Sequence, residues 1–205
     1  EYAAEKDKPV VVLKIGKSAD GTRAVRSHTA SLAGSAEVTS TVLAQFGAIE
    51  VDDTDELSDT AALITRVGQW RGNRVCVLSY SGGSNGLCSD HVAKAGLAMS
   101  ELAEATVKGL CEASSRFATH RNPLDIGAEV LSNPQSAKTI LDLVLADDNV
   151  DIILSAIPME HEDVTAVLAG ILADAQARTE KLIVPVWNTG LLGDGYKVLC
   201  ERGMT

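Results

Sequence analysis

Hydrophobic residues along the chain fall into two patterns: short continuous apolar runs, and longer segments with an apolar residue every three or four positions. The nearly continuous β-branched run at residues 9–15 predicts a strand covered on both faces by helices, and residues 74–80 predict a buried strand. Further strands are predicted at residues 150–157 and 181–187. A shorter strand is predicted at residues 48–51. Such strands alternating with helical segments are typical of parallel sheets with right-handed crossovers. The pattern therefore predicts an α/β fold.

Helices are predicted between these strands from periodicity and from capping residues. One begins after Ser35 and ends at Gly47, and Asp53 opens an acidic capping sequence for a second that runs to about Val67. After a tight turn at residues 81–84, further helices are predicted at residues 85–94, 101–112 and 135–146. One later helix has the clearest apolar stripe: Val164, Val167, Leu168, Ile171, Leu172 and Ala175. Ligands bind at the carboxyl ends of strands in such sheets, so we expect function in the loops that follow the strands.

A polar, glycine-flanked segment at residues 68–73 separates two such units, because the cycle of strand and helix begins again after it. We place the first unit at residues 1–70 and the second at residues 73–205. The chain begins without Met and stops where an α/β pattern would continue into a strand. We therefore expect it to be a trimmed fragment.

Composition narrows the classes of partner. The 205 residues are 45% hydrophobic, which is enough for a real core, and 28 acidic against 18 basic side chains give a net charge of -10. That charge disfavours nucleic acid and anionic membrane surfaces. Apolar runs fall far short of the roughly 20 residues that span a bilayer, and no signal segment opens the chain, so we expect a soluble, cytoplasmic protein. The cysteines form no C-x-x-C pair and predict neither disulfides nor a metal site: Cys76, Cys88, Cys111 and Cys200.

Two glycine-containing turns invite a functional interpretation. Residues 14–18 only partly match a phosphate-binding loop, since Val11 stands where its first glycine is needed, and a turn with solvated lysines is the better account. Residues 79–83 resemble the G-x-S-x-G elbow of serine hydrolases, with Asp125 and His161 following in the right order, although Ser79 replaces the first glycine. Alternatively, the glycines of this turn let backbone N–H groups converge on an anion.

His28 lies among small and hydroxyl-bearing residues at positions 27–35, in a predicted loop just before a helix. A lone loop histidine is usually a surface residue. A phosphorylated imidazole, however, needs hydroxyls, backbone N–H groups and helix N-termini around it, and small residues allow that approach. His91, within a predicted helix, and His120, beside an arginine, lack such surroundings. His28 is therefore the candidate for covalent chemistry.

Several segments carry a resemblance to a known family: residues 8–16, 27–35, 81–83, 121–125 and 147–151. In these segments the chain resembles the NDP-forming acyl-CoA synthetases, the relatives of succinyl-CoA synthetase, and the histidine motif is the most specific part. The resemblance implies two flavodoxin-like units. The first is the incomplete back half of the succinyl-CoA-ligase-like domain, and the second is the neighbouring flavodoxin-like ligase domain.

The resemblance also implies an activity. Acyl-CoA and phosphate give an acyl phosphate, His28 takes the phosphoryl group, and phospho-His28 passes it to ADP or GDP. The implied cofactors are CoA, ATP or ADP, Mg²⁺ and phosphate, held mainly by a CoA-binding Rossmann domain and an ATP-grasp domain or subunit outside this chain. The substrate is a small carboxylic acid, an oligomer is expected, and the fragment alone should be inactive. The implied phosphate and substrate contacts are Ser27, Thr29, Ser81, Gly82, Gly83, Asn122 and Asp125.

Three departures from the family pattern bear on the site. Ala30 and Tyr80 stand where relatives often have Gly and Asn. Succinyl-CoA synthetase has a helix that begins with two glycines, and residues 158–161 stand at that place here without them. Two alternatives stay open: a non-catalytic, acyl-CoA-sensing regulatory module, and a serine hydrolase that uses Ser81.

Overall fold

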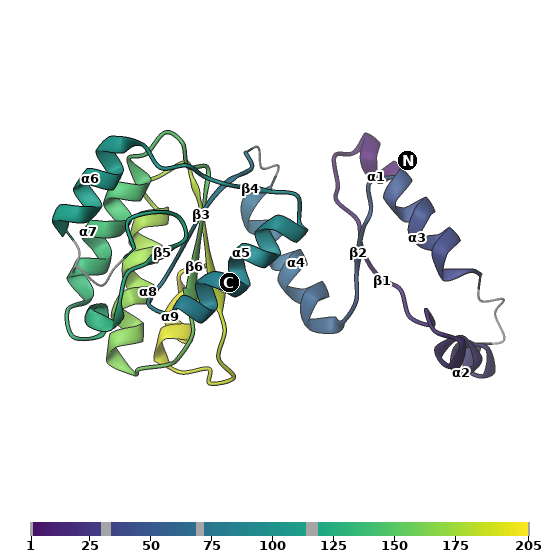
Figure 1. Cartoon of the computed structure of the whole chain (residues 1–205). Coiled ribbons are helices and arrows are strands. Elements are labelled where there is room, and N and C mark those ends of the chain that lie inside the picture. The colour runs from purple at the N-terminus through teal and green to yellow at the C-terminus, as the bar shows by residue number, and fades with distance from the viewer. Residues whose placement is uncertain (1, 30–33, 69–71, 114–118, 205) are drawn as a thin grey trace. The chain divides into compact units, whose positions relative to one another are not determined.

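The computed structural model describes residues 2–29, 34–68, 72–113 and 119–204 (Figure 1). The chain divides into two compact units, Glu1–Gln69 and Trp70–Thr205, called unit 1 and unit 2 below. Both have an α/β architecture in which every described strand pair is parallel, so the predicted fold class is confirmed.

Unit 1 is built on a two-stranded sheet. Strands β1 (Val11–Leu13) and β2 (Ile49–Val51) pair in parallel, with Val11 opposite Ile49. A parallel pair needs a crossover connection, and two helices supply it here. The helices of unit 1 are α1 (Tyr2–Glu5), α2 (Ala19–Thr29), α3 (Ala36–Gln45) and α4 (Thr54–Val67).

The two helices predicted in unit 1 begin at their predicted caps. Ser35 Oγ accepts a hydrogen bond from the backbone N of Val38 at 3.4 Å at the start of α3. Asp53 Oδ1 accepts from Glu56 N at 2.7 Å, and Glu56 Oε2 accepts from Asp52 N at 2.7 Å, at the start of α4. These reciprocal bonds satisfy N–H groups that a helix start leaves without intrahelical partners.

Helix α2 corrects the sequence interpretation, which has a loop between β1 and the helix after Ser35. Gly16 turns the chain with a φ of 77°, and Ser18 Oγ accepts from Gly21 N at 3.0 Å at the start of the helix. Thr22 Oγ1 donates to Gly16 O at 2.9 Å. The helix was missed because its sequence has too few apolar residues to give a stripe, whereas these local hydrogen bonds suffice to start it.

Unit 2 has a parallel sheet around a central strand. The strand order is β4-β3-β6-β7. Strand β5 lies on the same edge of β3 as β4: β4 pairs with the beginning of β3 and β5 pairs with its end. The order reverses between β3 and β6, where Val75 lies opposite Ile152. The strands are β3 (Arg74–Ser79), β4 (Ala98–Met99), β5 (Leu124–Asp125), β6 (Ile152–Ile157) and β7 (Leu182–Trp187).

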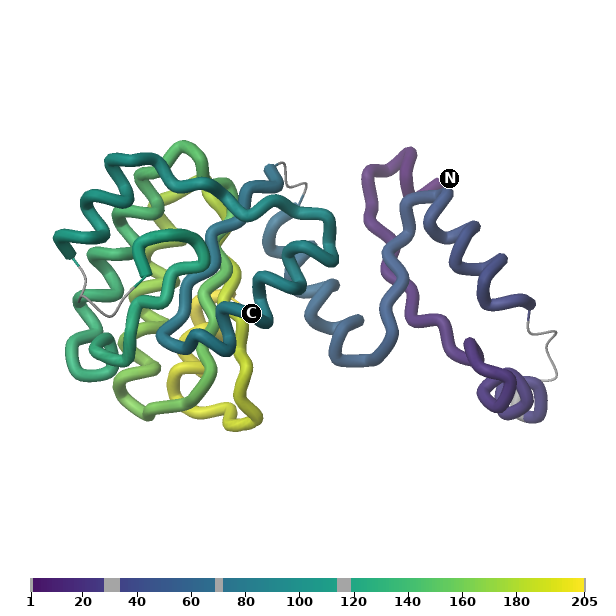
Figure 2. Tube along the Cα trace, viewed as in Figure 1, coloured from purple at the N-terminus to yellow at the C-terminus, as the bar shows by residue number. Residues whose placement is uncertain are grey.

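Helices cover both faces of this sheet. Side chains alternate along β3, so Val75 and Val77 pack with α5, whereas Cys76 and Leu78 join the larger cluster with α6, α7 and α8 (Figures 1 and 2). The helices are α5 (Gly82–Lys94), α6 (Glu104–Ala113), η1 (Ala128–Leu131), α7 (Pro134–Leu145), α8 (Asp163–Gln176) and α9 (Asp194–Glu201).

Two details of unit 2 differ from expectation. Helix α5 begins at Gly82 rather than after a turn at residues 81–84, so both glycines belong to its first turn. In α8 the buried face is rotated from the predicted stripe, because Val167 is 44% exposed and Thr165 is fully buried. A Cβ on Gly195 of α9 would lie 2.5 Å from Thr165 Cγ2, so close packing against α9 selects small side chains on that face.

The described residues also bear on membranes, metals and thiols. Within them, no helix combines the length and hydrophobicity needed to cross a bilayer. No group of three or more His, Cys, Asp or Glu side chains in this part of the chain is arranged to hold a metal ion. All four cysteines are free, and burial raises the pKa of Cys76 to about 12, so this thiol stays neutral in the core.

Candidate functional site

The reversal of strand order in unit 2 defines the candidate site. In open parallel sheets a crevice forms outside the carboxyl ends of the two strands at which the order reverses, and ligands bind there. In unit 2 these strands are β3 and β6. The loops that follow them are residues 80–81 and residues 158–162, and both lie at this edge.

The first loop leads into the N-terminus of α5. Ser81 caps the helix, since its Oγ accepts from Ser84 N at 3.4 Å. Ser79 fastens the loop to β6 by donating from Oγ to Ala156 O at 2.8 Å while accepting from Ser81 N at 3.2 Å. The first N–H groups of a helix have no intrahelical partner and carry partial positive charge, so the start of α5 suits an anionic group.

Asp125 lies beside this turn. A Cβ on Gly82 would be 3.5 Å from Asp125 Oδ2, and the other carboxylate oxygen accepts from Gly127 N at 3.0 Å. Thr119 Oγ1 accepts from Asp125 N at 2.7 Å. The structure thus brings together four of the predicted contacts: Ser81, Gly82, Gly83 and Asp125.

The side-chain amide of Asn122 has a different place. Its Oδ1 accepts from Val77 N at 2.9 Å, and its Nδ2 donates to Val75 O at 2.7 Å and to Ser100 O at 3.0 Å. Strand β4 pairs with the beginning of β3 and β5 with its end, so this amide fills the gap between them like a peptide group. Its polar atoms are therefore engaged along the middle of β3.

Tyr80 joins the two loops of the site. Its Oη donates to Met159 O at 2.9 Å, and its ring centroid lies 6.2 Å from that of His161. Burial raises the pKa of Tyr80, which keeps the phenol protonated as a donor. Glu162, at the start of α8, has a φ of 48°, a left-handed conformation that is strained for a residue other than glycine.

Glu160 ties the second loop to α9. Its Oε1 accepts from Gly195 N at 3.4 Å, and Oε2 is buried without a hydrogen-bond partner. A Cβ on Gly193 would lie 2.5 Å from Glu160 Cδ, so a larger residue there would displace the Glu160 carboxyl group from its present place. Sequence reasoning missed both Tyr80–Met159 and Glu160–Gly195, because each contact joins residues far apart in the chain. The only local sign of this site was the pair of glycines, Gly82 and Gly83, shortly after β3, and it indicates the turn at α5 rather than these two contacts.

The serine-hydrolase alternative finds no support in this geometry. Ser81 has a φ of -133°, ordinary extended backbone, whereas the nucleophile of the elbow sits on a strained turn. Among the residues that the structure describes, no hydrogen bond joins Ser81 to Asp125 or His161. Ser81 acts here as a helix cap.

In unit 1, the backbone of His28 lies in the last turn of α2 rather than in a loop. The side chains of His28 and Thr29, and all of residues 30–33, lie outside the described part of the chain. Ser27 is described, and its Oγ donates to Ala24 O at 2.7 Å within the helix.

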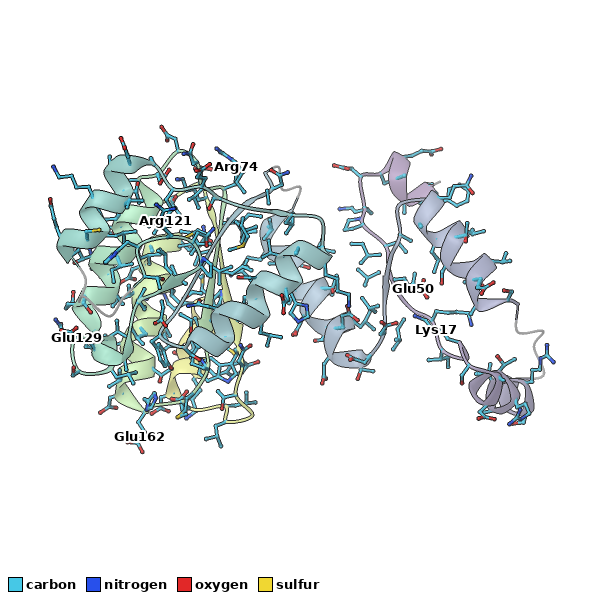
Figure 3. The ribbon with its side chains drawn as sticks, in the orientation of Figure 1. Lys17, Glu50, Arg74, Arg121, Glu129 and Glu162 are labelled. Carbon is cyan, nitrogen blue, oxygen red and sulfur yellow. The ribbon has the colours of Figure 1, made fainter. Side chains whose placement is uncertain are left out.

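Lys17 connects the carboxyl ends of the two strands of unit 1. Its Nζ lies 3.0 Å from Glu50 Oε1 and 2.6 Å from Asp52 Oδ1 (Figure 3). These contacts correct the expectation of a merely solvated lysine. Hydrogen bonds from Lys17 to Asp52 and Glu50 raise the pKa of the lysine, and hydrogen bonds from Ser40 and Lys17 lower the pKa of Glu50.

Known proteins resemble this chain in sequence. Residues 1–64 match the family model of the succinyl-CoA ligase like flavodoxin domain. The chain is 32% identical over 209 residues to the alpha subunit of the ADP-forming acetate–CoA ligase II of Pyrococcus furiosus, covering 96% of this chain and 43% of that protein. It is 33% identical over 148 residues to the ADP-forming 4-hydroxybutyrate–CoA ligase of Nitrosopumilus maritimus, covering 72% and 21% respectively.

A solved structure resembles it in fold. The dinucleotide forming acetyl-coenzyme A synthetase 1 of Ca. Korarchaeum cryptofilum, in complex with phosphate and ADP, superposes with a TM-score of 0.83 and 22% identity, covering 98% of this chain and 44% of that one. The chain thus spans less than half the length of these relatives. The chain thus resembles a segment of the NDP-forming acyl-CoA synthetases, and its residues 1–64 match the succinyl-CoA ligase like flavodoxin domain.

Proposed function

We propose that the protein containing this chain is an acid–thiol ligase. It interconverts acyl-CoA, a nucleoside diphosphate and phosphate with a carboxylic acid, CoA and a nucleoside triphosphate, through a phosphohistidine at His28. The observation that carries this proposal is the similarity to an ADP-forming acetate–CoA ligase subunit across 96% of the chain.

The reaction divides into three transfers. A phosphate oxygen attacks the acyl carbon, the C–S bond breaks, and CoA leaves as the thiolate. The imidazole of His28 then attacks the phosphorus of the acyl phosphate, the P–O bond breaks, and the carboxylate leaves. Finally a terminal oxygen of the nucleoside diphosphate attacks the phosphorus and the P–N bond breaks. A covalent intermediate replaces one improbable encounter by easier steps.

The described residues support a role for unit 2 in holding the charged groups. Backbone N–H groups of Gly82 and Gly83 at the start of α5 would bind phosphate oxygens, an interaction typically worth about 0.3–1 kcal/mol for a helix terminus. Asp125 lies beside this turn. Ser27, Thr29 and Asn122 remain proposed contacts of phosphate or substrate, carried by the family resemblance.

Cofactors and partners follow from the same proposal. CoA, nucleotide and phosphate are substrates, and a CoA-binding Rossmann domain and an ATP-grasp domain or subunit would bind the first two. Mg²⁺ would accompany the nucleotide. We also expect the complete protein to be oligomeric.

Phosphohistidine formation tests the proposal. The full-length protein, incubated with γ-labelled ATP and Mg²⁺, should gain a phosphate that is labile in acid and stable in base. His28→Asn should abolish labelling, whereas His91→Asn, at a position on α5, should retain it. Equal labelling of His28→Asn and the parent protein would refute the assignment.

A further inference from the structure

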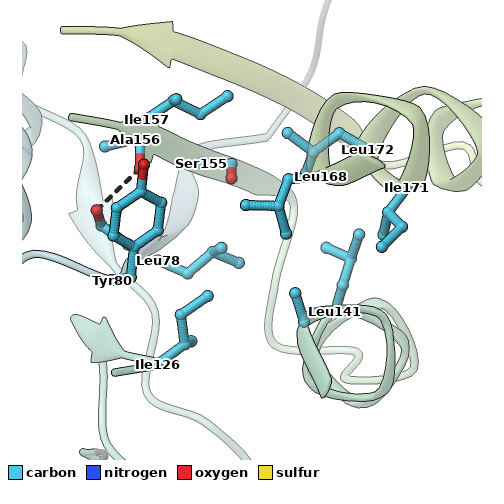
Figure 4. Close-up of a pocket in the computed structure, with 12 residues that line it drawn as sticks. Leu78, Tyr80, Ile126, Leu141, Ser155, Ala156, Ile157, Leu168, Ile171 and Leu172 are labelled. Carbon is cyan, nitrogen blue, oxygen red and sulfur yellow. Dashed lines mark hydrogen bonds between the residues drawn. The ribbon is translucent and has the colours of Figure 1, made fainter. Parts of the chain in front are cut away.

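A small apolar cavity opens beside the switch-point loops of unit 2. It has a volume of about 30 Å³ and lies between the sheet and helices α7 and α8 (Figure 4). Leu78 and Tyr80 of the β3 end form one side and Leu141 and Leu168 the opposite side, with Ser155 between them. The cavity therefore reaches the carboxyl ends of β3 and β6, where the family site is expected.

The wall of this cavity is poorly suited to water. Of its three hydroxyls, that of Ser79 bonds to Ala156 O and that of Tyr80 bonds to Met159 O. Ser155 is only 6% exposed, and its hydroxyl, which faces the cavity, has no hydrogen bond among the described residues. A buried water needs two to four polar partners, and displacing a poorly held water by an apolar group gains affinity.

Tyr80 occupies a position between this cavity and the anion-binding turn. It follows β3 and immediately precedes Ser81, so the cavity wall and the start of α5 are adjacent in the chain. The bond from its Oη to Met159 O, 2.9 Å long, holds the half-buried ring across the two loops. A ligand with an anionic head at the start of α5 would have to pass this ring to place an apolar tail in the cavity on the other face of the sheet.

We propose that the cavity receives the hydrocarbon end of the acyl group and that Tyr80 restricts this end to short chains. A volume of about 30 Å³ admits only roughly two or three water-sized spheres at about 10–15 Å³ each, so it has room for a short hydrocarbon chain and not for a long one. The assignment of the ligand as an acyl group rests on the proposed ligase function. Tyr80 is then a residue that determines chain-length specificity.

Binding of unactivated carboxylates tests this inference. Sodium acetate, propionate, butyrate, valerate and hexanoate are titrated against the full-length protein by saturation-transfer NMR. Affinity should rise roughly three- to fourfold per methylene while the chain still fits, and fall about tenfold once it exceeds the cavity. Tyr80→Ala should move the optimum to acids at least two carbons longer, and kcat/KM for the acids should follow the same order.

Filling the cavity gives the complementary test. Leu168→Phe should weaken propionate and butyrate binding about tenfold or more, and Ser155→Val, a smaller change, should have the same direction if Leu168→Phe fails to fold. Val167→Phe is the matched control, because Val167 lies on the same helix but is 44% exposed. It should leave the chain-length profile unchanged.

Two results separate the inference from the proposed function. If the parent protein forms no phosphohistidine but these acids still bind with the expected length profile, the ligase proposal fails and the cavity assignment stands. If labelling at His28 is normal but Tyr80→Ala, Leu168→Phe and Ser155→Val all keep the parent profile, the cavity is only a packing void and the inference is wrong.

Discussion

Units 1 and 2 obey the same local rules but differ in what they bury. Among the described residues of unit 1, Val51 is the one buried hydrophobic side chain, whereas unit 2 contains two buried clusters. Helix α3 has the apolar spacing of a helix laid on a sheet, yet Val38, Val42 and Phe46 are 63%, 44% and 53% exposed. Periodicity and caps therefore specify a helix, while burial needs a sheet wide enough to cover it.

The first unit has two strands, which offer little area for two helices to cover. Unit 2, by contrast, encloses its central strand β3 between neighbours on both sides. The difference in stability between the two units should follow the difference in burial.

Truncation of a core residue should show the largest contrast. Ile153, in β6, is fully buried, and Ile153→Ala should destabilise unit 2 by about 2–5 kcal/mol through lost burial and a residual cavity. Val42→Ala, at a position that is 44% exposed, should change stability by less than about 0.5 kcal/mol. Hydrogen exchange of the protected amides in each unit measures both costs. Equal costs at the two positions would contradict the comparison.

Replacing Asn122 should have the next largest effect. Asn122→Ala leaves the N–H of Val77 and the carbonyl of Ser100 without the amide that serves them, at a cost of about 1–3 kcal/mol. Hydrogen exchange at the Val77 amide should accelerate. Asn133→Ala is a suitable control, since Asn133 is exposed and makes no side-chain cap bond to α7. An unchanged exchange rate at Val77 would show that the amide does not complete the sheet.

Local features could be predicted from the sequence, and distant contacts could not. Strands β3, β6 and β7 and the cap at Asp53 depend on residues within one turn or one run, and the structure has them where expected. The two-residue strands β4 and β5 were not predicted, because they are too short to give an apolar run. Helix α2 was not predicted from the sequence, because its start depends on Gly16 and Ser18 rather than on an apolar stripe. The rotated face of α8 depends on close packing with Gly195, which no local pattern reveals.

The same distinction holds in the candidate site: its local turn could be predicted from the sequence, and its contacts between loops could not. The turn at Ser81 was visible because a capping serine and two glycines follow a strand. The contact of Tyr80 with Met159 and that of Glu160 with Gly195 join different loops, so only the fold reveals them. Asn122 is recognisable in the sequence through the family motif, but its role along β3 follows from the break between β4 and β5.

The smallest expected effect is a difference in how the ion pairs of the two units respond to low pH. Asp151 is 21% exposed and accepts hydrogen bonds from the Arg74 side chain, and this pairing lowers the pKa of Asp151 from 3.8 to about 2. A lowered carboxyl pKa means that the ionised form stabilises the folded state. This contribution is complete above about pH 4 and is lost as the pH falls towards 2.

In unit 2 the loss between pH 4 and pH 2 should amount to about 1–2 kcal/mol after allowance for solvent screening, measured by denaturant unfolding at each pH. Asp151→Asn should remove this part of the pH dependence. In unit 1 the carboxylate of Asp52 is 83% exposed, so water and salt screen its pairing with Lys17, and Asp52→Asn should leave the acid profile unchanged. If Asp52→Asn flattened the profile as much as Asp151→Asn, exposure would not decide the strength of these pairs, and burial could not explain the contrast between the units.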